Sequence, residues 1–253
     1  PFNFPLNLVL HKICPALLAG NCVVLKPAPQ TPLTAHWIAK AFHDTDLPAG
    51  MIQVIPTDHA EYVAQHPAVQ GITFTGSSAV GEQLQRQRPS IPVWVEGGGT
   101  APVIIHEQPP DLSAFCQAFM QSAFGYAGQT CISTQQVWVP HNAYEALMSE
   151  LLIQIQSISP THPLTQGSLL SSMISQDAAH TFLHRLERYK ENGAQVVWGG
   201  TRHHACVTPT LLSREQADPH YLAQELFGPV MMIVPYSDFE PVLETANSSP
   251  YGL

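Results

Sequence analysis

Charged side chains are scarce in this chain of 253 residues, in which Asp, Glu, Lys and Arg together make up only 11%. Lys and Arg total 10 and form no cluster, so the sequence lacks the basic surface that nucleic-acid binding requires. Hydrophobic residues reach 45%, which excludes a disordered chain, because disorder needs low hydrophobicity and high net charge. The net charge of −9 bears on solubility more than on substrate choice. We expect a globular protein with no nucleic-acid partner.

Cysteine is also sparse, and no hydrophobic run reaches the length of a membrane span. A disulfide scaffold needs a shorter chain that is denser in cysteine, so the sequence indicates a reducing compartment. We therefore expect a cytoplasmic protein without a membrane partner. The five cysteines are Cys14, Cys22, Cys116, Cys131 and Cys206.

Short apolar runs alternate with helix-like segments along residues 1–97. This alternation predicts a parallel α/β sheet of the Rossmann-like kind found in nucleotide-binding folds. Pro15 interrupts the first helical segment and predicts a kink or break there. The expected helices cover 6–18, 31–44 and 77–87, and the expected strands cover 22–25, 52–55, 71–74 and 92–95.

Three glycines at 97–99 mark an expected hinge, and a second α/β unit follows over residues 98–253. Residues 160–172 are polar and without periodicity, which is typical of a loop. The expected strands cover 103–105, 136–139, 196–198 and 230–234, and the expected helices cover 111–124, 142–157 and 176–192.

Three residues carry the chemistry that the sequence suggests. Cys131 closes the run Gly128-Gln129-Thr130-Cys131, and a thiol after such a turn is a candidate nucleophile. Glu96 is a candidate general base, and the side-chain amide of Asn3 is a candidate donor to an oxyanion. Each residue taken alone also has an ordinary interpretation, as a buried thiol, a solvated carboxylate and a turn or capping amide.

Six short motifs occur in an order that resembles the aldehyde dehydrogenase superfamily. Their specificity lies in the order, since each motif alone is common. They extend over nearly the whole chain. They are Pro1-Phe2-Asn3-Phe4-Pro5, Lys26-Pro27, Phe74-Thr75-Gly76-Ser77, Glu96-Gly97-Gly98, Gly128-Gln129-Thr130-Cys131 and Glu225-Leu226-Phe227-Gly228-Pro229.

The resemblance implies oxidation of a small aldehyde with NAD or NADP. The Cys131 thiolate would attack the aldehyde, and the Asn3 amide with the Cys131 N–H would hold the oxyanion. After hydride transfer, Glu96 would activate the water that hydrolyses the thioester. The resemblance also implies that residues 1–97 form a cofactor-binding domain, residues 98–253 form a catalytic domain, and the full-length protein is a homo-oligomer.

The expected cofactor contacts come from the resemblance as well. By pattern alone, the turn over residues 76–81 is an ordinary strand-to-helix connection, because it lacks the Lys of a P-loop and the strict dinucleotide fingerprint. In the family this turn lies beside the pyrophosphate. The residues assigned to the cofactor are Lys26, Pro29, Thr75, Gly76, Ser77, Val80, Gly81, Gly97, Glu225 and Phe227.

The chain departs from the family pattern at several positions. Pro29 stands where the family often has a Glu that binds the adenosine ribose and repels a 2′-phosphate, so NADP is allowed as well as NAD. Gly97 replaces a usual Leu, and Thr100 replaces a usual Lys. Residues 203–206 contain two His and a Cys, but their spacing favours a surface loop, and no metal is expected.

Two alternatives stay open. A CoA-acylating relative would use the same thiol without a base, and Glu96 argues against it. A noncatalytic fragment or structural paralogue would keep the fold alone, and the intact set of Asn3, Glu96 and Cys131 argues against that. The chain begins inside the Asn3 motif, so we expect the natural protein to be longer at both ends, with both domains incomplete here and residues 1–253 poorly stable alone.

Overall fold

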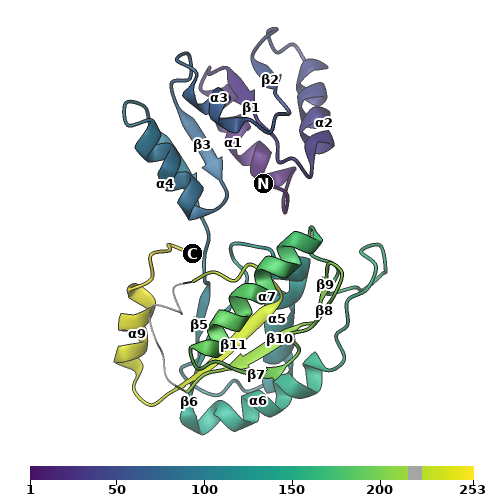
Figure 1. The fold of residues 1–253 in the computed structure, drawn as a ribbon, viewed down its shortest axis with the longest axis vertical. Coiled ribbons are helices and arrows are strands. Elements are labelled where there is room, and N and C mark those ends of the chain that lie inside the picture. The colour runs from purple at the N-terminus through teal and green to yellow at the C-terminus, as the bar shows by residue number, and fades with distance from the viewer. Residues whose placement is uncertain (216–223) are drawn as a thin grey trace. The chain divides into compact units, whose positions relative to one another are not determined.

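The computed structural model describes residues 1–215 and 224–253, which form two compact units, Pro1–Gly97 and Gly98–Leu253 (Figure 1). Both units combine helices with parallel strands, so the predicted α/β class is confirmed. The roles of cofactor binding and catalysis that the sequence assigned to these two spans stay predictions. No helix within the described ranges is long and apolar enough to cross a membrane.

The strands of the first unit pair in parallel, but they form two separate sheets. β1 (Val23–Leu25) pairs with β2 (Ile52–Val54), and β3 (Ile72–Thr75) pairs with β4 (Val93–Glu96). The sequence predicted one sheet in this unit, and that expectation is wrong. Hydrophobic patterning locates strands, whereas strands of three or four residues carry too little sequence information to specify every neighbour.

Four helices belong to this unit. They are α1 (Asn7–Leu18), α2 (Pro32–His43), α3 (Ala60–Gln65) and α4 (Ser78–Gln87). The break expected at Pro15 does not occur, because α1 runs through it. Pro15 is exposed, so the bond lost with its missing N–H is on the side where water can replace it. The small core of the unit contains Val9, Ile13, Ile38, Ala39 and Ile52.

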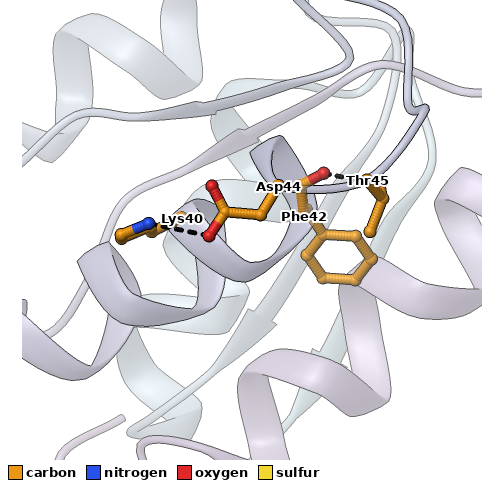
Figure 2. Close-up of polar contacts among 4 residues, drawn as sticks. All are labelled: Lys40, Phe42, Asp44 and Thr45. Atoms are coloured by element: carbon orange, nitrogen blue, oxygen red, sulfur yellow. Dashed lines mark hydrogen bonds and ion pairs between the residues drawn. The ribbon is translucent and has the colours of Figure 1, made fainter.

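Local polar contacts mark where α2 ends (Figure 2). The Lys40 ammonium lies 2.7 Å from the Asp44 carboxylate, and the Thr45 hydroxyl donates to the Phe42 carbonyl at 2.6 Å. The second bond satisfies a carbonyl of the last helical turn, which has no partner within the helix. Because Lys40 and Asp44 are exposed, their ion pair adds at most about 1 kcal/mol.

The second unit is built on one five-stranded sheet with the order β5-β6-β11-β10-β7. All neighbours are parallel except β7, which runs antiparallel to β10 at the edge. The strands are β5 (Pro102–Ile104), β6 (Gln136–Pro140), β7 (Gln195–Trp198), β10 (Thr210–Ser213) and β11 (Val230–Tyr236).

Helices cover both faces of this sheet (Figure 1). α5 (Leu112–Phe124) and α6 (His141–Ile155) pack on one face, and α7 (Gln176–Glu191) packs on the other. Successive residues of β11 alternate between the two cores, which is why Val230–Val234 is apolar without interruption. The central strands therefore anchor the loops at their ends firmly.

Smaller elements complete this unit. A short 3₁₀ turn, η1 (Gly125–Gly128), follows α5, and α9 (Phe239–Asn247) lies near the end of the chain. The loop expected around His203 is instead an antiparallel hairpin of β8 (Arg202–His203) and β9 (Cys206–Val207). Strands of two residues are too short to leave a readable alternation in the sequence.

Candidate active site

The turn before Cys131 has an unusual backbone. Tyr126 and Ala127 both have φ of 55°, and Gly128 has φ of 66°, so three consecutive residues are left-handed. This conformation costs about 1–2 kcal/mol for each residue other than glycine. Such strain persists only where the surroundings hold the chain, and it is concentrated at functional sites.

The side chain of Gln129 supplies part of that support. It is buried, its Nε2 donates to the Tyr126 carbonyl at 3.0 Å, and its Oε1 accepts the Ile174 N–H at 3.0 Å. The Gln129 N–H also bonds to the Tyr126 carbonyl, at 3.2 Å. Gln129 therefore ties the turn to the segment before α7. Gln129 belongs to the Gly128–Cys131 motif, but the motif alone does not explain why this residue is a glutamine.

Gly128 lets the turn pack closely because it has no side chain. A Cβ there would overlap the Gly228 carbonyl, so two backbones meet directly at this point. The contact joins the Cys131 turn to the Glu225–Pro229 motif, which precedes β11. Two motifs that lie about a hundred residues apart in the sequence are thus packed together in the second unit.

Cys131 is half-buried, as are Cys14 and Cys206. The Cys131 carbonyl approaches Gly99 so closely that a Cβ on Gly99 would overlap it. Cys116, by contrast, is completely buried on α5, and burial raises the pKa of its thiol to about 12. Cys116 is therefore a core residue without a reactive thiolate, as its place in a helix predicted. Cys22 is exposed in the first unit.

Glu225 turns its carboxylate toward the glycine segment. Its Oε1 accepts the Gly99 N–H at 3.1 Å, and a Cβ on Gly98 would overlap the carboxylate. Burial raises the pKa of this carboxyl, while the Gly99 N–H and the charge of Arg185 oppose that change. Phe227 is left-handed with φ of 48°, so this loop is strained as well.

In the first unit, the carboxyl ends of β3 and β4 bring Thr75 and Glu96 side by side in register. The Gly76 N–H donates to the Glu96 carbonyl at 3.1 Å, and Glu96 itself is exposed. The Thr75 hydroxyl is buried and has no hydrogen-bond partner in the structure of residues 1–97. An orphaned polar atom beside the turn that opens α4 fits a bound polar ligand.

The helix that follows this turn packs tightly on its strand. A Cβ on Gly81 would overlap Val95 of β4, so the N-terminal turn of α4 can approach the sheet closely. Ser77 is the N-cap residue and is exposed, and its side chain makes no capping hydrogen bond. Val80 is exposed on the same turn. A Cβ on Gly97 would lie 2.7 Å from the Ser78 hydroxyl, which makes glycine the fitting residue there.

The adenosine-side candidates lie on the loop after β1. Lys26 is half-buried and Pro29 is exposed, so neither side chain belongs to the core. The Asn3 side-chain oxygen accepts the Phe4 N–H at 3.1 Å, which leaves Nδ2 as the donor end of its amide.

Lys12 was missed by the sequence reasoning. It lies on α1, its Nζ atom is buried, and that atom makes no hydrogen bond in the structure of the first unit. Burial lowers the pKa of this ammonium, and the charge of Glu96 partly opposes that change. The only signal was a cation within a largely apolar segment, which is more often a solvated position.

The predicted residues thus fall into two groups. Asn3, Lys26, Pro29, residues 75–81, Glu96 and Gly97 belong to the first unit, whereas Cys131, Glu225 and Phe227 belong to the second. Within the described ranges, no group of three or more His, Cys, Asp or Glu side chains is arranged to hold a metal ion.

Sequence comparison places the chain among known proteins. A family model described as "Aldehyde dehydrogenase family" matches residues 1–253. The chain is 36% identical over 256 residues to 3-sulfolactaldehyde dehydrogenase of Priestia aryabhattai, covering 100% of this chain and 54% of that protein. It is 35% identical over 263 residues to phenylacetaldehyde dehydrogenase of Pseudomonas fluorescens, covering 100% and 52%. The chain spans about half the length of these curated relatives.

Solved structures agree. An aldehyde dehydrogenase of Mycobacterium tuberculosis complexed with NAD+ superposes with a TM-score of 0.92 at 31% identity, covering 100% of this chain and 54% of that one. NADP-dependent glyceraldehyde-3-phosphate dehydrogenase of Bacillus halodurans, complexed with NADP, superposes with a TM-score of 0.90 at 31% identity, covering 100% and 53%.

The contact between Gly128 and Gly228 predicts that alanine is tolerated at position 125 of this turn but not at position 128. In the natural protein, Gly128→Ala should lower the melting temperature and displace Cys131, because its Cβ meets backbone and its φ is positive. Gly125→Ala is the matched control, since a Cβ there meets nothing within 4 Å. Thermal melts and the rate of Cys131 alkylation measure both effects. Equal behaviour of the two variants would contradict this account of the turn.

Burial of Glu225 predicts a pH-dependent cost in stability. The folded protein holds the Glu225 proton more tightly than the unfolded chain does, so stability falls as pH rises above the ordinary carboxyl pKa of 4.5. Glu225→Gln should therefore melt higher than the wild type at pH 7, and the difference should shrink toward pH 4. Exposed Glu145 provides the control variant Glu145→Gln. A difference that does not change with pH would refute the assignment.

Proposed function

The chain belongs to the aldehyde dehydrogenase family, and from that premise we propose that the natural protein oxidises an aldehyde to a carboxylic acid with NAD+ or NADP+. The observation that carries the proposal is the strained turn that presents half-buried Cys131 and is packed against the Glu225 motif. A catalytic thiol needs a fixed position and access to substrate, and this turn provides both.

Cys131 is the proposed nucleophile. Its thiolate adds to the aldehyde carbon, and the carbonyl oxygen becomes the oxyanion of a thiohemiacetal. The Asn3 amide donates from Nδ2, and the Cys131 N–H is the second donor. These donors stabilise the charge as it develops.

Glu96 is the proposed general base for the second half of the reaction. Once the thiohemiacetal has been oxidised to a thioester, its carboxylate takes a proton from water, which attacks the thioester carbon and releases the acid. The exposure of Glu96 suits a group that exchanges protons with water. The Lys12 ammonium lies within electrostatic reach of Glu96, whose charge acts on the pKa of Lys12.

A bound NAD(P)+ would supply the hydride acceptor. The residues present fit such a group: the orphaned Thr75 hydroxyl and exposed Ser77 stand at the opening of α4, where a pyrophosphate is favoured by the helix terminus. Lys26 would donate to the adenosine ribose. Glu225 would accept from the nicotinamide ribose hydroxyls, with Phe227 beside it.

The relatives suggest where to look for the substrate. The two relatives described above are named for 3-sulfolactaldehyde and phenylacetaldehyde, which differ in charge and size. An assay of the natural protein over sulfonated, aromatic and small aliphatic aldehydes, with each cofactor, tests the proposed function directly. NAD(P)H formation without added CoA supports it, whereas an absolute requirement for CoA would support the acylating alternative.

Replacement of the base should separate the two half-reactions. We expect Glu96→Gln to release one burst of NAD(P)H and then to turn over about 10²–10⁴-fold more slowly, because only thioester hydrolysis loses its base. Stopped-flow fluorescence measures the burst and the steady rate. Cys131→Ser is the reference that should abolish both phases. Normal turnover by Glu96→Gln would overturn the role proposed for Glu96.

Exposed Pro29 predicts relaxed cofactor choice. NADP+ should bind at least as well as NAD+, because no carboxylate at position 29 repels the 2′-phosphate. Pro29→Glu should shift the preference toward NAD+, and Pro29→Gln is the matched uncharged control. Fluorescence titrations of the three proteins with both cofactors provide the measurement. Strong selectivity of the wild type for NAD+ would show that a residue other than Pro29 sets the cofactor preference.

A further inference from the structure

The loop that carries Glu225 is joined to the glycine segment by a closed ring of hydrogen bonds through Gln135. Gln135 Nε2 donates to the Gly99 carbonyl at 3.0 Å, and its Oε1 accepts the Leu226 N–H at 2.8 Å. The Gly99 N–H in turn bonds to Glu225 Oε1 at 3.1 Å. The ring therefore runs from the Glu225 carboxylate through Gly99 and Gln135 back to the backbone beside Glu225.

Two side chains of α7 hold the same loop from another direction. The Tyr189 hydroxyl donates to the Gln224 carbonyl at 2.5 Å, and one Arg185 guanidinium nitrogen donates to the Glu225 carbonyl at 3.2 Å. Arg185 and Tyr189 are four residues apart, so they lie on one face of the helix. Tyr189 is 3% exposed and Gln135 is 4% exposed, whereas Arg185 is exposed.

Packing alone does not explain why residue 135 is a glutamine. An apolar side chain would fill a buried position just before β6 without the cost of desolvating an amide. That cost is offset only where both ends of the amide are bonded, and here one end binds Gly99 and the other binds Leu226. The Gln135 side chain therefore serves mainly to link Gly99 to Leu226, and not to fill the core.

The loop needs such links because it is strained. Phe227 adopts a left-handed backbone, which a non-glycine residue keeps only when its surroundings hold it. A Glu side chain also has three rotatable bonds, so a carboxylate that must meet two ribose hydroxyls gains from a fixed backbone.

We propose that Gln135 and Tyr189, assisted by Arg185, are positioning residues that fix Glu225 for recognition of the nicotinamide-side ribose. This inference rests on the proposed function, since it assumes a nicotinamide cofactor. The hydrogen bonds that join these three side chains to the loop all involve its backbone atoms. Gln135 also bonds to Gly99, whose N–H holds the Glu225 carboxylate. The charge of Arg185 acts on that carboxylate as well.

The test compares a whole cofactor with its adenosine half. In the natural protein, Gln135→Met and Tyr189→Phe should weaken binding of the preferred dinucleotide about 3- to 10-fold, as expected for the loss of one or two hydrogen bonds. Binding of ADP, or of adenosine 2′,5′-bisphosphate if NADP+ is preferred, should stay within about twofold of wild type, because neither probe contains the nicotinamide ribose. Fluorescence or calorimetric titration gives both dissociation constants without turnover.

Matched variants separate positioning from general damage. Tyr144→Phe removes a comparable tyrosine hydroxyl bond, to Ser213 at 2.6 Å, away from the Glu225 loop, and should alter neither constant. Arg185→Gln, at an exposed position, gives a further test if Gln135→Met fails to fold, and we expect it to weaken dinucleotide binding about twofold to threefold.

Several outcomes would overturn the inference. Unchanged dinucleotide binding by Gln135→Met and Tyr189→Phe would do so, and so would an equal loss of both probes, which would indicate a merely structural role. If the selective loss is found but the wild type oxidises no aldehyde, the positioning role stands and the proposed function fails. If the wild type oxidises aldehydes and the variants bind the dinucleotide normally, the proposed function stands and the positioning role fails.

Discussion

The second unit depends on one close approach of two backbones, where Gly128 meets the Gly228 carbonyl. No side chain fits between them, so the turn that carries Cys131 and the loop that carries Glu225 share one position in space. The contact explains why residue 128 is glycine, whereas a Cβ on Gly228 would overlap the Phe182 side chain. It also explains how the left-handed residues Tyr126, Ala127 and Phe227 persist, because each strained loop is held by the other and by buried polar side chains.

The sequence did not predict the roles of the buried polar side chains. The α/β class and the parallel strands of the first unit followed from apolar runs and their spacing, because burial of a strand leaves a direct record in composition. Gln129, Gln135 and Lys12 left no such record. A buried amide or ammonium is recognised by its partners and its surroundings, and those come from distant parts of the chain. Gln129 was part of a recognised motif, but the motif predicted no role for its side chain.

The departures in the fold have similar causes. The break expected at Pro15 did not occur because the ring faces outward, which propensity alone does not reveal. The single sheet expected in the first unit is two separate pairs, and β7 is an antiparallel edge strand. Local patterns identified most strands but not β10, and the neighbours of each strand are set by loops and by packing. The assignment of individual residues to catalysis and to the cofactor rests on resemblance and chemistry, and the experiments above address it.

The order of strands has a consequence for how the chain is made. β11 lies at the centre of its sheet between β6 and β10, yet it enters the sequence last. During synthesis, β6 must wait for about ninety further residues, which takes roughly 5–20 s at ribosomal speeds. Throughout that interval one edge of β6 and much of its apolar surface have no partner. The turn that carries Cys131 can reach its packed position against Gly228 only after the segment that leads into β11 has been synthesised.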